Sequence, residues 1–392
     1  MTSTERTWAA TRLEKTDRVP VVPFLSPEPA AHLAGMTMAQ VSNDAKIAEM
    51  AFFKVFDDCG GWDCAYGGPI TPVQMQAANI YPMKMRIPGK DLPDDYMFQL
   101  LEEEVMKPED YEKLCEMGAD AFYYEDYLWR IASFRPDELQ THLNELLTNW
   151  GPYIEELKKR KIEPFLAAHE FHPFFRLSLM RSMIPFTKDI YYNPAPVERA
   201  MKKMTAELIP KQIGVCKAFG MKSWLFVDER ASGVNYPLSV FERFWWPYTQ
   251  EIVDAFWSEG ITTIFHLDTC WNKNLPYFRK LPKGSAVVGL DSTTNIFLAK
   301  EILRDHLCIY GDVPASLLSL GKPEEVTAYC RKLIDEVGQG GGFILGTGCA
   351  TPPNCISENF KAMVATGKSY ELGKNQRSAR ARPTIAVPKR SN

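Results

Sequence analysis

The stretch TTIFHLDTCWNKNLPYFRKLPKGSAVVGLD, residues 262–291, contains the pattern that decides the fold. It begins with the apolar run TTIFHL and ends with a second run, SAVVGL, and an aspartate follows each of them, at Asp268 and Asp291. Short runs rich in β-branched and aromatic residues predict buried strands. The stretch therefore predicts two strands with a polar side chain directly after each.

The same pattern continues along most of the chain. From about residue 163 onward, strand-like runs alternate with segments of helical period, and these runs are EPFLAAH, SWLFVD, TTIFHLD, SAVVGLD, CIYGDV and GFILGT. Upstream, RVPVVPFL and WDCAYGG supply two further candidate strands. A total of about eight favours an α/β fold of the closed (β/α)8 TIM barrel type over an open doubly wound sheet. The sequence contains no G-x-G-x-x-G or Walker-type glycine loop, which argues against a nucleotide-binding alternative.

We expect a single catalytic barrel domain over residues 1–370. Residues from about 86 to 160 do not follow the alternating pattern, and their acidic, aromatic composition predicts helical insertions beside the barrel. The final segment, residues 371–392, is basic and contains prolines, which predicts an extended tail.

Composition narrows the class of protein. The 392 residues are 45% hydrophobic and 24% charged, so the chain can bury a large core. A formal net charge of -4 gives no reason to expect nucleic acid or an anionic membrane as a partner. The N-terminal segment is polar and no apolar run approaches the length of a membrane span, so we expect a cytoplasmic protein whose nine cysteines stay reduced.

Polar side chains follow six predicted strands in succession. In a barrel, the active site lies at the C-terminal ends of the strands, which we call the barrel mouth, so these residues should converge there. Capping and loop roles explain single residues of this kind but account less well for six strands in a row. The residues are His169, Glu170 and His172, then Asp228, then His266, Asp268 and Cys270, then Asp291, Asp312 and Cys349.

The cysteine and histidine members of this set indicate a soft metal ion. A catalytic zinc site uses three protein ligands drawn from thiolate, imidazole and carboxylate groups, with a fourth position open. His266 and Cys270 follow one strand, and Cys349 follows the last strand about 80 residues later. Asp268 could replace one of these ligands or support them through a hydrogen bond. The spacing leaves both possibilities open.

Several longer segments resemble a known family. They are DRVPVVPFL near the start, FVDERASG in the middle, and CIYGDVPASLLSLGKPEEV followed by GGGFILGTGCATPPNCISENFKAM. Together they are similar to the uroporphyrinogen decarboxylase superfamily, and the similarity covers residues from about 15 to 368. This resemblance implies a (β/α)8 barrel and either of two chemistries, porphyrinogen decarboxylation or corrinoid-linked methyl transfer.

The residues favour the methyltransferase branch. The decarboxylases bind a carboxylate-rich substrate with an arginine-rich stretch after the first strand, but here that stretch is PFLSPEPAAHLAG, without arginine. The methyltransferase branch, as in methylcobalamin:coenzyme M methyltransferases, binds zinc through a His-x-Cys pair and a later cysteine. His266 and Cys349 match that pattern, whereas Asp268 stands at the position of the first cysteine. The resemblance therefore implies that either Asp268 or Cys270 completes the site.

The expected function is zinc-dependent methyl transfer from a small substrate, in the first place an aryl methyl ether, to Co(I) of a corrinoid. The chain has no D-x-H-x-x-G corrinoid signature, so cobalamin should be carried by a partner protein. One alternative is a methylcobalamin:thiol methyltransferase. Another is a uroporphyrinogen-decarboxylase-like or tetrapyrrole-binding barrel without zinc. The sequence leaves open the direction of transfer and whether the protein is a homodimer.

Roles at the barrel mouth follow from this function. A carboxylate should orient the substrate or receive its proton, and the candidates are Asp228, which also matches the family's middle motif, Glu170 and Asp312. Rings and histidines near the strand ends could form a slot for a flat substrate, although such rings also pack in cores. The predicted substrate contacts are His169, His172, Phe171, Trp271 and Tyr124, and the neighbouring rings are Phe174, Phe175, Tyr123, Tyr127 and Trp129.

Overall fold

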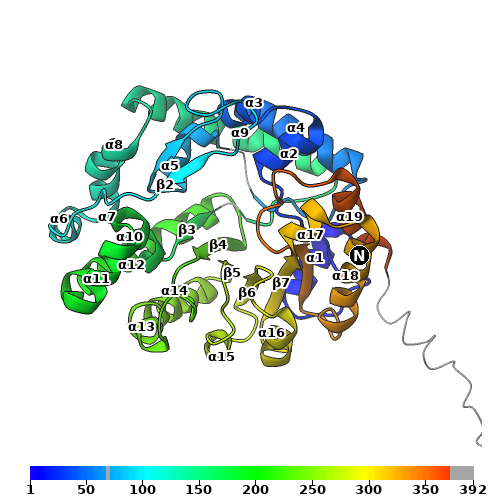
Figure 1. The fold of residues 1–392 in the computed structure, drawn as a ribbon. Coiled ribbons are helices and arrows are strands. Elements are labelled where there is room, and N and C mark those ends of the chain that lie inside the picture. Colours follow the sequence, from blue (N-terminus) through cyan, green and yellow to red (C-terminus); the bar gives the residue numbers. More distant parts are fainter. Residues whose placement is uncertain (68–70, 167, 371–392) are drawn as a thin grey trace, which may run out of the picture.

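A parallel sheet forms the centre of the molecule. The computed structural model describes residues 1–67, 71–166 and 168–370, so the predicted tail at 371–392 lies outside the described residues. Six strands pair in parallel and in chain order: β3 (His169–Phe171), β4 (Ser223–Asp228), β5 (Thr262–Leu267), β6 (Ala286–Leu290), β7 (Cys308–Val313) and β8 (Phe343–Thr347). Figure 1 shows these strands at the centre, with helices around them.

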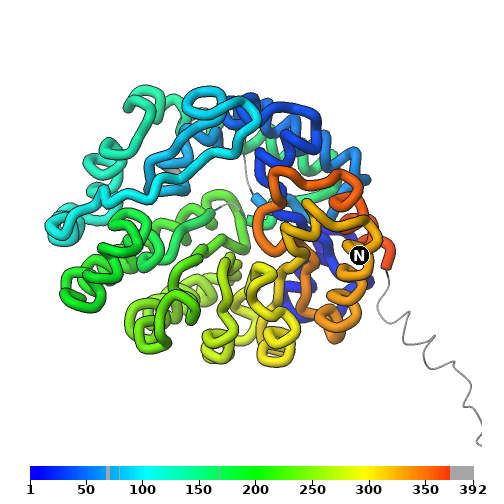
Figure 2. Tube along the Cα trace, viewed as in Figure 1, coloured from blue at the N-terminus to red at the C-terminus, as the bar shows by residue number. Residues whose placement is uncertain are grey.

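Two N-terminal segments continue this sheet into a ring. Val21 bridges Leu345 of β8 in parallel, and the Asp63 amide donates to the Val21 carbonyl at 2.8 Å. Ala65 in turn bridges Pro164, in the segment that leads into β3. Figure 2 shows the N-terminal segment beside the C-terminal helices, as the pairing with β8 requires. The predicted (β/α)8 barrel is confirmed.

Helices surround the barrel in the order that the sequence pattern predicts. Before β3 lie α1 (Ser3–Thr11), α2 (Pro27–Ala34), α3 (Met38–Asn43), α4 (Ala45–Asp58), the 3-10 turn η1 (Val73–Met75) and α5 (Gln76–Asn79). After β3 lie α10 (Pro173–Arg181), α11 (Met183–Tyr192), α12 (Pro194–Ala218), α13 (Leu238–Phe244), α14 (Trp246–Ser258), α15 (Leu275–Phe278), α16 (Ile296–Leu303), α17 (Ala315–Leu320), α18 (Pro323–Glu336) and α19 (Ser357–Ser369).

The segment expected to hold helical insertions also contains a small sheet. Strands β1 (Lys84–Arg86) and β2 (Gln99–Leu101) pair in an antiparallel ribbon. The helices that follow are α6 (Asp110–Met117), α7 (Ala119–Phe122), the π-helical turn η2 (Tyr123–Tyr127), α8 (Leu128–Ile131) and α9 (Pro136–Lys159). None of the helices described by the structure is long and apolar enough to cross a membrane.

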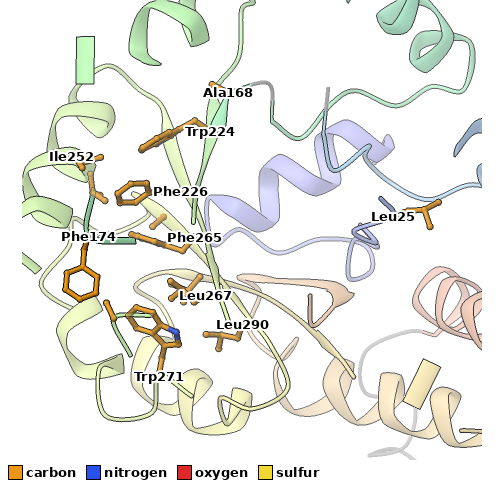
Figure 3. Packing of buried hydrophobic residues seen from close by; sticks show 14 of the residues in the cluster. Leu25, Ala168, Phe174, Trp224, Phe226, Ile252, Phe265, Leu267, Trp271 and Leu290 are labelled. Carbon is orange, nitrogen blue, oxygen red and sulfur yellow. The ribbon is translucent and has the colours of Figure 1, made fainter. Parts of the chain in front are cut away.

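The core has two layers because residues on a strand alternate between the two faces of the sheet. Ile264, Val287 and Tyr310 face the barrel interior, where Ala10 of α1 packs against the same cluster. Residues of the other face pack against the surrounding helices. Figure 3 shows this outer layer, with Trp224, Phe226, Phe265, Phe174 and Trp271 among its large side chains.

Candidate active site

Three possible metal ligands meet at the barrel mouth. His266 is in β5, Asp268 follows that strand, and Cys349 follows β8. Their ligand atoms all lie within 4.8 Å of one another. The Cys349 Sγ atom is 3.5 Å from His266 Nε2 and 3.4 Å from Asp268 Oδ2, and the latter two atoms are 3.4 Å apart. We call these three residues the metal-ligand group.

The alternation of the strand directs two of these side chains to one place. Ile264 faces the barrel interior, so His266, two residues further on, faces the same way at the mouth. Leu267 packs in the outer layer. Asp268 comes next, and the Trp271 indole N–H donates to its carbonyl at 2.7 Å.

Of the two candidates for the third ligand, the structure groups Asp268 with His266 and Cys349. Thr269 has a φ of 68°, in the left-handed region, which turns the chain directly after Asp268. Cys270 follows that turn, and its thiol is not part of the metal-ligand group formed by the described residues.

The charges in this group favour a cation. Burial disfavours the imidazolium form of His266, but the Asp268 carboxylate and Cys349 outweigh it and raise the pKa of His266 well above its usual value. Burial would raise the pKa of Asp268, whereas attraction to His266 lowers it overall. The buried Asp268 Oδ1 atom has no hydrogen-bond partner among the described residues. An imidazole nitrogen, a carboxylate oxygen and a thiol sulfur are a donor set that fits Zn²⁺.

Three aromatic side chains lie on one side of the metal-ligand group, and we call them the aromatic wall: Phe24, Tyr66 and Tyr310. The Phe24 ring meets His266 edge-on, with ring centres 5.6 Å apart, and Tyr66 stacks on Phe24 at 4.3 Å. Tyr310 of β7 lies 5.6 Å from Tyr66. Sequence analysis did not select Phe24 or Tyr66. Both lie near the ends of the N-terminal strand-like runs RVPVVPFL and WDCAYGG, and the strand-end rule could have found them.

Glu229 is a further carboxyl group that sequence analysis did not select. Burial and the nearby Asp268 carboxylate raise its pKa to about 7, while His266 acts in the opposite direction. The hydroxyl of Tyr81 lies in the same electrostatic environment, because burial and then Glu229, Glu28, Cys349 and Asp268 raise its pKa. The signal was present in the sequence, since Glu229 directly follows the selected Asp228.

The Asp228 carboxylate is buried, and three N–H groups of the protein donate hydrogen bonds to it. It accepts hydrogen bonds from the amides of Arg230, at 2.7 Å, and Ala231, at 2.8 Å, and from the Trp245 indole, at 2.9 Å. It is 1% exposed. Burial raises its pKa to about 7 even though these donors favour the anion. This environment fits a residue that shapes the turn after β4, and its predicted catalytic role stays a prediction.

The predicted site residues after β3 lie in three different environments. His169 is half-buried at the start of the strand. Glu170 forms an ion pair with Arg176 at 2.6 Å. His172 is fully buried, accepts a hydrogen bond from the Phe174 amide and stacks on Trp245, and burial lowers its pKa to about 3. Such burial does not favour the predicted contact between His172 and a substrate.

The aspartates after β6 and β7 have local partners. Asp291 accepts hydrogen bonds from the amides of Thr269 and Thr293, as expected for a residue that caps a turn. Asp312 is 2% exposed and accepts a hydrogen bond from the Tyr329 hydroxyl of α18 at 2.8 Å. Its carboxylate is therefore held on the helix side of the sheet, which does not favour its predicted role in proton transfer.

Most of the predicted aromatic slot belongs to the core. Phe171 packs with Phe175 and Val227, and Trp271 is fully buried beside Trp245. Phe174 belongs to the main core cluster, as do Tyr123 and Tyr127. Tyr124 and Trp129 are 36% and 37% exposed. The ring that contacts the metal-ligand group is Phe24 of the aromatic wall.

The fold and the site define an α/β barrel of the (β/α)8 type, built from six parallel strands and two bridged N-terminal segments, with a candidate metal-binding group at its mouth. The chain belongs to the uroporphyrinogen decarboxylase (URO-D) family, which matches residues 171–370, just over half of the chain. This confirms the superfamily that the sequence motifs predicted.

Individual relatives add detail. The methylcobamide:CoM methyltransferase MtbA of Methanosarcina acetivorans is 25% identical over 176 residues, which cover 42% of this chain and 50% of the relative. A uroporphyrinogen decarboxylase of Coxiella burnetii is 29% identical over 94 residues, 24% of this chain and 26% of the relative. The match thus spans about half the length of MtbA and about a quarter of the length of the decarboxylase. A solved structure of a methyltransferase from Methanosarcina mazei has the same fold, with a TM-score of 0.66 at 16% identity over 94% of this chain and 98% of that one.

Proposed function

We propose that this protein is a zinc-dependent methyltransferase that transfers a methyl group from a small substrate to the Co(I) corrinoid of a separate protein. The observation that carries the proposal is the metal-ligand group at the barrel mouth. The similarity to methylcobamide:CoM methyltransferases supports the corrinoid as the second reactant.

The aromatic wall supports an aryl methyl ether as the substrate. Phe24 and Tyr66 present a stacked pair of rings beside His266, and a flat aromatic ring packs well against such a surface. The stretch after the first barrel segment contains Glu28 and no arginine, which does not favour the carboxylate-rich substrate of a porphyrinogen decarboxylase.

The residues of the mouth have distinct parts in this reaction. When bound, Zn²⁺ would act as a Lewis acid on the ether oxygen and make it a better leaving group. Phe24 and Tyr66 hold the ring and keep water away from the methyl carbon. The carbon–oxygen bond breaks with its electron pair left on oxygen, the methyl group forms a bond to the corrinoid cobalt, and the oxygen then takes up one proton. We assign Glu229, whose pKa burial and then the Asp268 carboxylate raise to about 7, to orient the substrate and supply that proton.

A thiol-directed methyltransferase is the second candidate. The named relatives from Methanosarcina act between methylcobamide and CoM, which favours a thiol acceptor. In that reaction Zn²⁺ held by the same metal-ligand group would stabilise the acceptor sulfur as a thiolate.

One assay separates the two candidates. The zinc-loaded protein is mixed with guaiacol and a corrinoid protein held as Co(I), and the cobalamin spectrum is recorded. We expect a methylated corrinoid and free catechol, and neither product with zinc-depleted protein. If methylated corrinoid is instead consumed when a thiol is added, and no methoxy-aromatic is demethylated, the thiol-directed function is correct.

Paired variants test the assignment of Glu229. Glu229→Gln should lower the rate of methyl transfer at least about tenfold while the melting temperature stays unchanged, because general acid–base groups contribute this much or more. Asp228→Asn should instead lower the melting temperature, since its amide nitrogen would face one of the three N–H donors around Asp228. Full activity in Glu229→Gln, with loss of activity in a stable Asp228→Asn, would return the role to Asp228.

A further inference from the structure

Thr269, directly after Asp268 of the metal-ligand group, has a backbone conformation that its side chain disfavours. Its φ of 68° lies in the left-handed region, and among the described residues it is the one β-branched residue with a positive φ. A branched Cβ crowds the backbone in this region, so the conformation costs free energy, and it persists only where the surrounding structure holds it. Thr269 therefore needs partners that keep it in place.

Hydrogen bonds engage every polar group of Thr269. Its amide donates to Asp291 Oδ2 at 3.0 Å, and its carbonyl accepts from the Thr294 hydroxyl at 3.0 Å. Its hydroxyl donates to the Ser232 hydroxyl at 2.8 Å, and the Glu229 carbonyl is a second acceptor at 3.3 Å. The backbone is thus fixed to the segment after β6, and the side chain is fixed to the segment after β4.

The bonds of the side chain join the two loops that carry the residues of the proposed reaction. Residues 229–237, after β4, begin with Glu229, and we call them the carboxyl loop. Residues 268–274, after β5, begin with Asp268, and we call them the ligand loop. Because Thr269 is the neighbour of Asp268 in the chain, its hydroxyl ties the carboxyl loop to a member of the metal-ligand group.

The same two loops also meet further from the metal-ligand group. A Cβ atom added at Gly233 would lie 3.0 Å from Cβ of Lys273, and the Lys273 ammonium donates to the Gly233 carbonyl at 3.3 Å. Lys273 is exposed, whereas Ser232 is fully buried. The bond between Ser232 and Thr269 is therefore the one better shielded from water, and Lys273 offers a matched contact between the same loops.

The peptide bond between Asp268 and Thr269 is held at both of its polar atoms. The Trp271 indole N–H donates to the Asp268 carbonyl at 2.7 Å, and the Thr269 amide donates to Asp291. The dihedral angles of Thr269 then set the direction of the chain toward Cys270, whose thiol is not part of the metal-ligand group formed by the described residues.

We propose that Thr269 is a positioning residue for the metal: its hydroxyl bond to Ser232 holds the left-handed turn that keeps Asp268 beside His266 and Cys349. The inference rests on the proposed function only in that the metal-ligand group binds Zn²⁺, and it is independent of the substrate. Without the hydroxyl, the ligand loop loses a bond that offsets its strained backbone, and Asp268 is held less firmly. Residues that orient a metal ligand commonly change metal affinity by about tenfold or more.

Zinc affinities of variants with and without the hydroxyl test this role. The full-length protein is stripped of metal, and zinc dissociation constants are measured by competition with a chromophoric chelator. Thr269→Ala should weaken zinc binding by about tenfold or more, whereas Thr269→Ser, which keeps the hydroxyl, should stay within about threefold of wild type. Ser232→Ala removes the other end of the bond and should also weaken zinc binding. Lys273→Ala is the matched control and should keep the wild-type affinity.

Two further measurements separate positioning from a general loss of structure. The visible spectrum of Co²⁺ bound in place of zinc reports the arrangement of the ligands. This spectrum should change in Thr269→Ala and stay as in wild type in Thr269→Ser. The metal-free Thr269→Ala protein should melt close to the wild-type temperature, because loss of the hydrogen bond and relief of the crowded branched side chain act in opposite directions.

The outcomes separate this inference from the function on which it rests. Wild-type zinc affinity in Thr269→Ala overturns the inference, and so does an equal loss of affinity in Thr269→Ser or in Lys273→Ala. A wild-type protein that binds no zinc overturns both the inference and the metal-dependent function. Zinc affinities in the expected order support the inference even if no methyl group reaches a corrinoid, in which case only the proposed reaction fails.

Discussion

At the scale of single residues, the site depends on which side chains two strand ends direct to the same point. His266 and Asp268 share one face of the chain, and Cys349 approaches from the other side of the mouth. The unusual member is Asp268, because a carboxylate oxygen is a harder donor than a thiolate and passes less charge to a bound metal. A metal with this donor set should polarise a substrate oxygen more strongly than one held by two thiolates.

This assignment predicts the metal content of three variants. Cys349→Ser and Asp268→Ala should each lower bound zinc from about one per chain to a small fraction, because a catalytic site has only three protein ligands. Cys270→Ser should keep the wild-type content. Metal analysis of purified, folded protein is the measurement, with circular dichroism as the control for folding. Full zinc in Cys349→Ser, or zinc lost only in Cys270→Ser, would contradict the assignment of ligands.

At the scale of elements, the close approach of β7 and β8 supports the aromatic wall. Tyr310 of β7 fills the barrel interior, and its hydroxyl donates to the Val22 carbonyl at 2.9 Å. The ring passes directly over Gly346 of β8, where an added Cβ atom would lie 2.3 Å from Tyr310 Cζ. Only glycine leaves room for this ring. Tyr310 in turn packs against Tyr66, so the contact extends to the ring that stacks on Phe24.

Adding one methyl group at Gly346 should therefore displace Tyr310. Gly346→Ala should destabilise the fold by about 1–3 kcal/mol, the usual cost of overpacking a core, and should weaken guaiacol binding. Gly214→Ala in α12 is the control, because no atom lies within 4 Å of its Cβ position and alanine favours a helix. Thermal and denaturant unfolding of both variants provide the test. Equal stability of Gly346→Ala and wild type would show that the barrel interior adapts to the extra volume.

At the scale of the whole molecule, the two ends of the barrel have separate tasks. The mouth contains the metal-ligand group, whereas the opposite end contains a buried ion-pair network around Asp63. The Asp63 carboxylate accepts hydrogen bonds from Arg6 of α1 at 2.7 Å, from Arg18 at 2.7 Å and from the Val21 amide at 2.8 Å. It joins α1 to the first two barrel segments and so helps to close the ring.

Removing Asp63 should reduce stability and spare the site. Asp63→Ala leaves Arg6 and Arg18 without their shared partner, and the loss of one member of a buried pair costs about 3–5 kcal/mol. The free energy of unfolding, from denaturant titration, should fall by this amount. The zinc content and guaiacol affinity of the folded fraction should stay within about twofold of wild type, in keeping with the general division of tasks in such barrels. Loss of zinc without loss of stability would contradict this separation.

The sequence by itself determined the architecture and the chemical type of the site. Strand-like runs that alternate with helices specify a parallel barrel, because the period of apolar residues is a local property. The same local pattern marked His266 and Cys349 as strand-end residues. The family resemblance added corrinoid-linked methyl transfer as an expectation, and the URO-D match confirms the family.

Only the tertiary structure decided which side chains face one another. The chain turns at Thr269, directly after Asp268, and the structure groups Asp268 with His266 and Cys349. Asp228 is buried, and its carboxylate accepts hydrogen bonds from the Arg230 and Ala231 amides and the Trp245 indole. The barrel ring also closes through short segments whose pairing is not visible in a run of letters. The physical reason is common to all of these. The direction of a side chain after a strand depends on backbone turns and on partners that are distant in the chain. Composition and residue spacing within one segment therefore do not specify that direction.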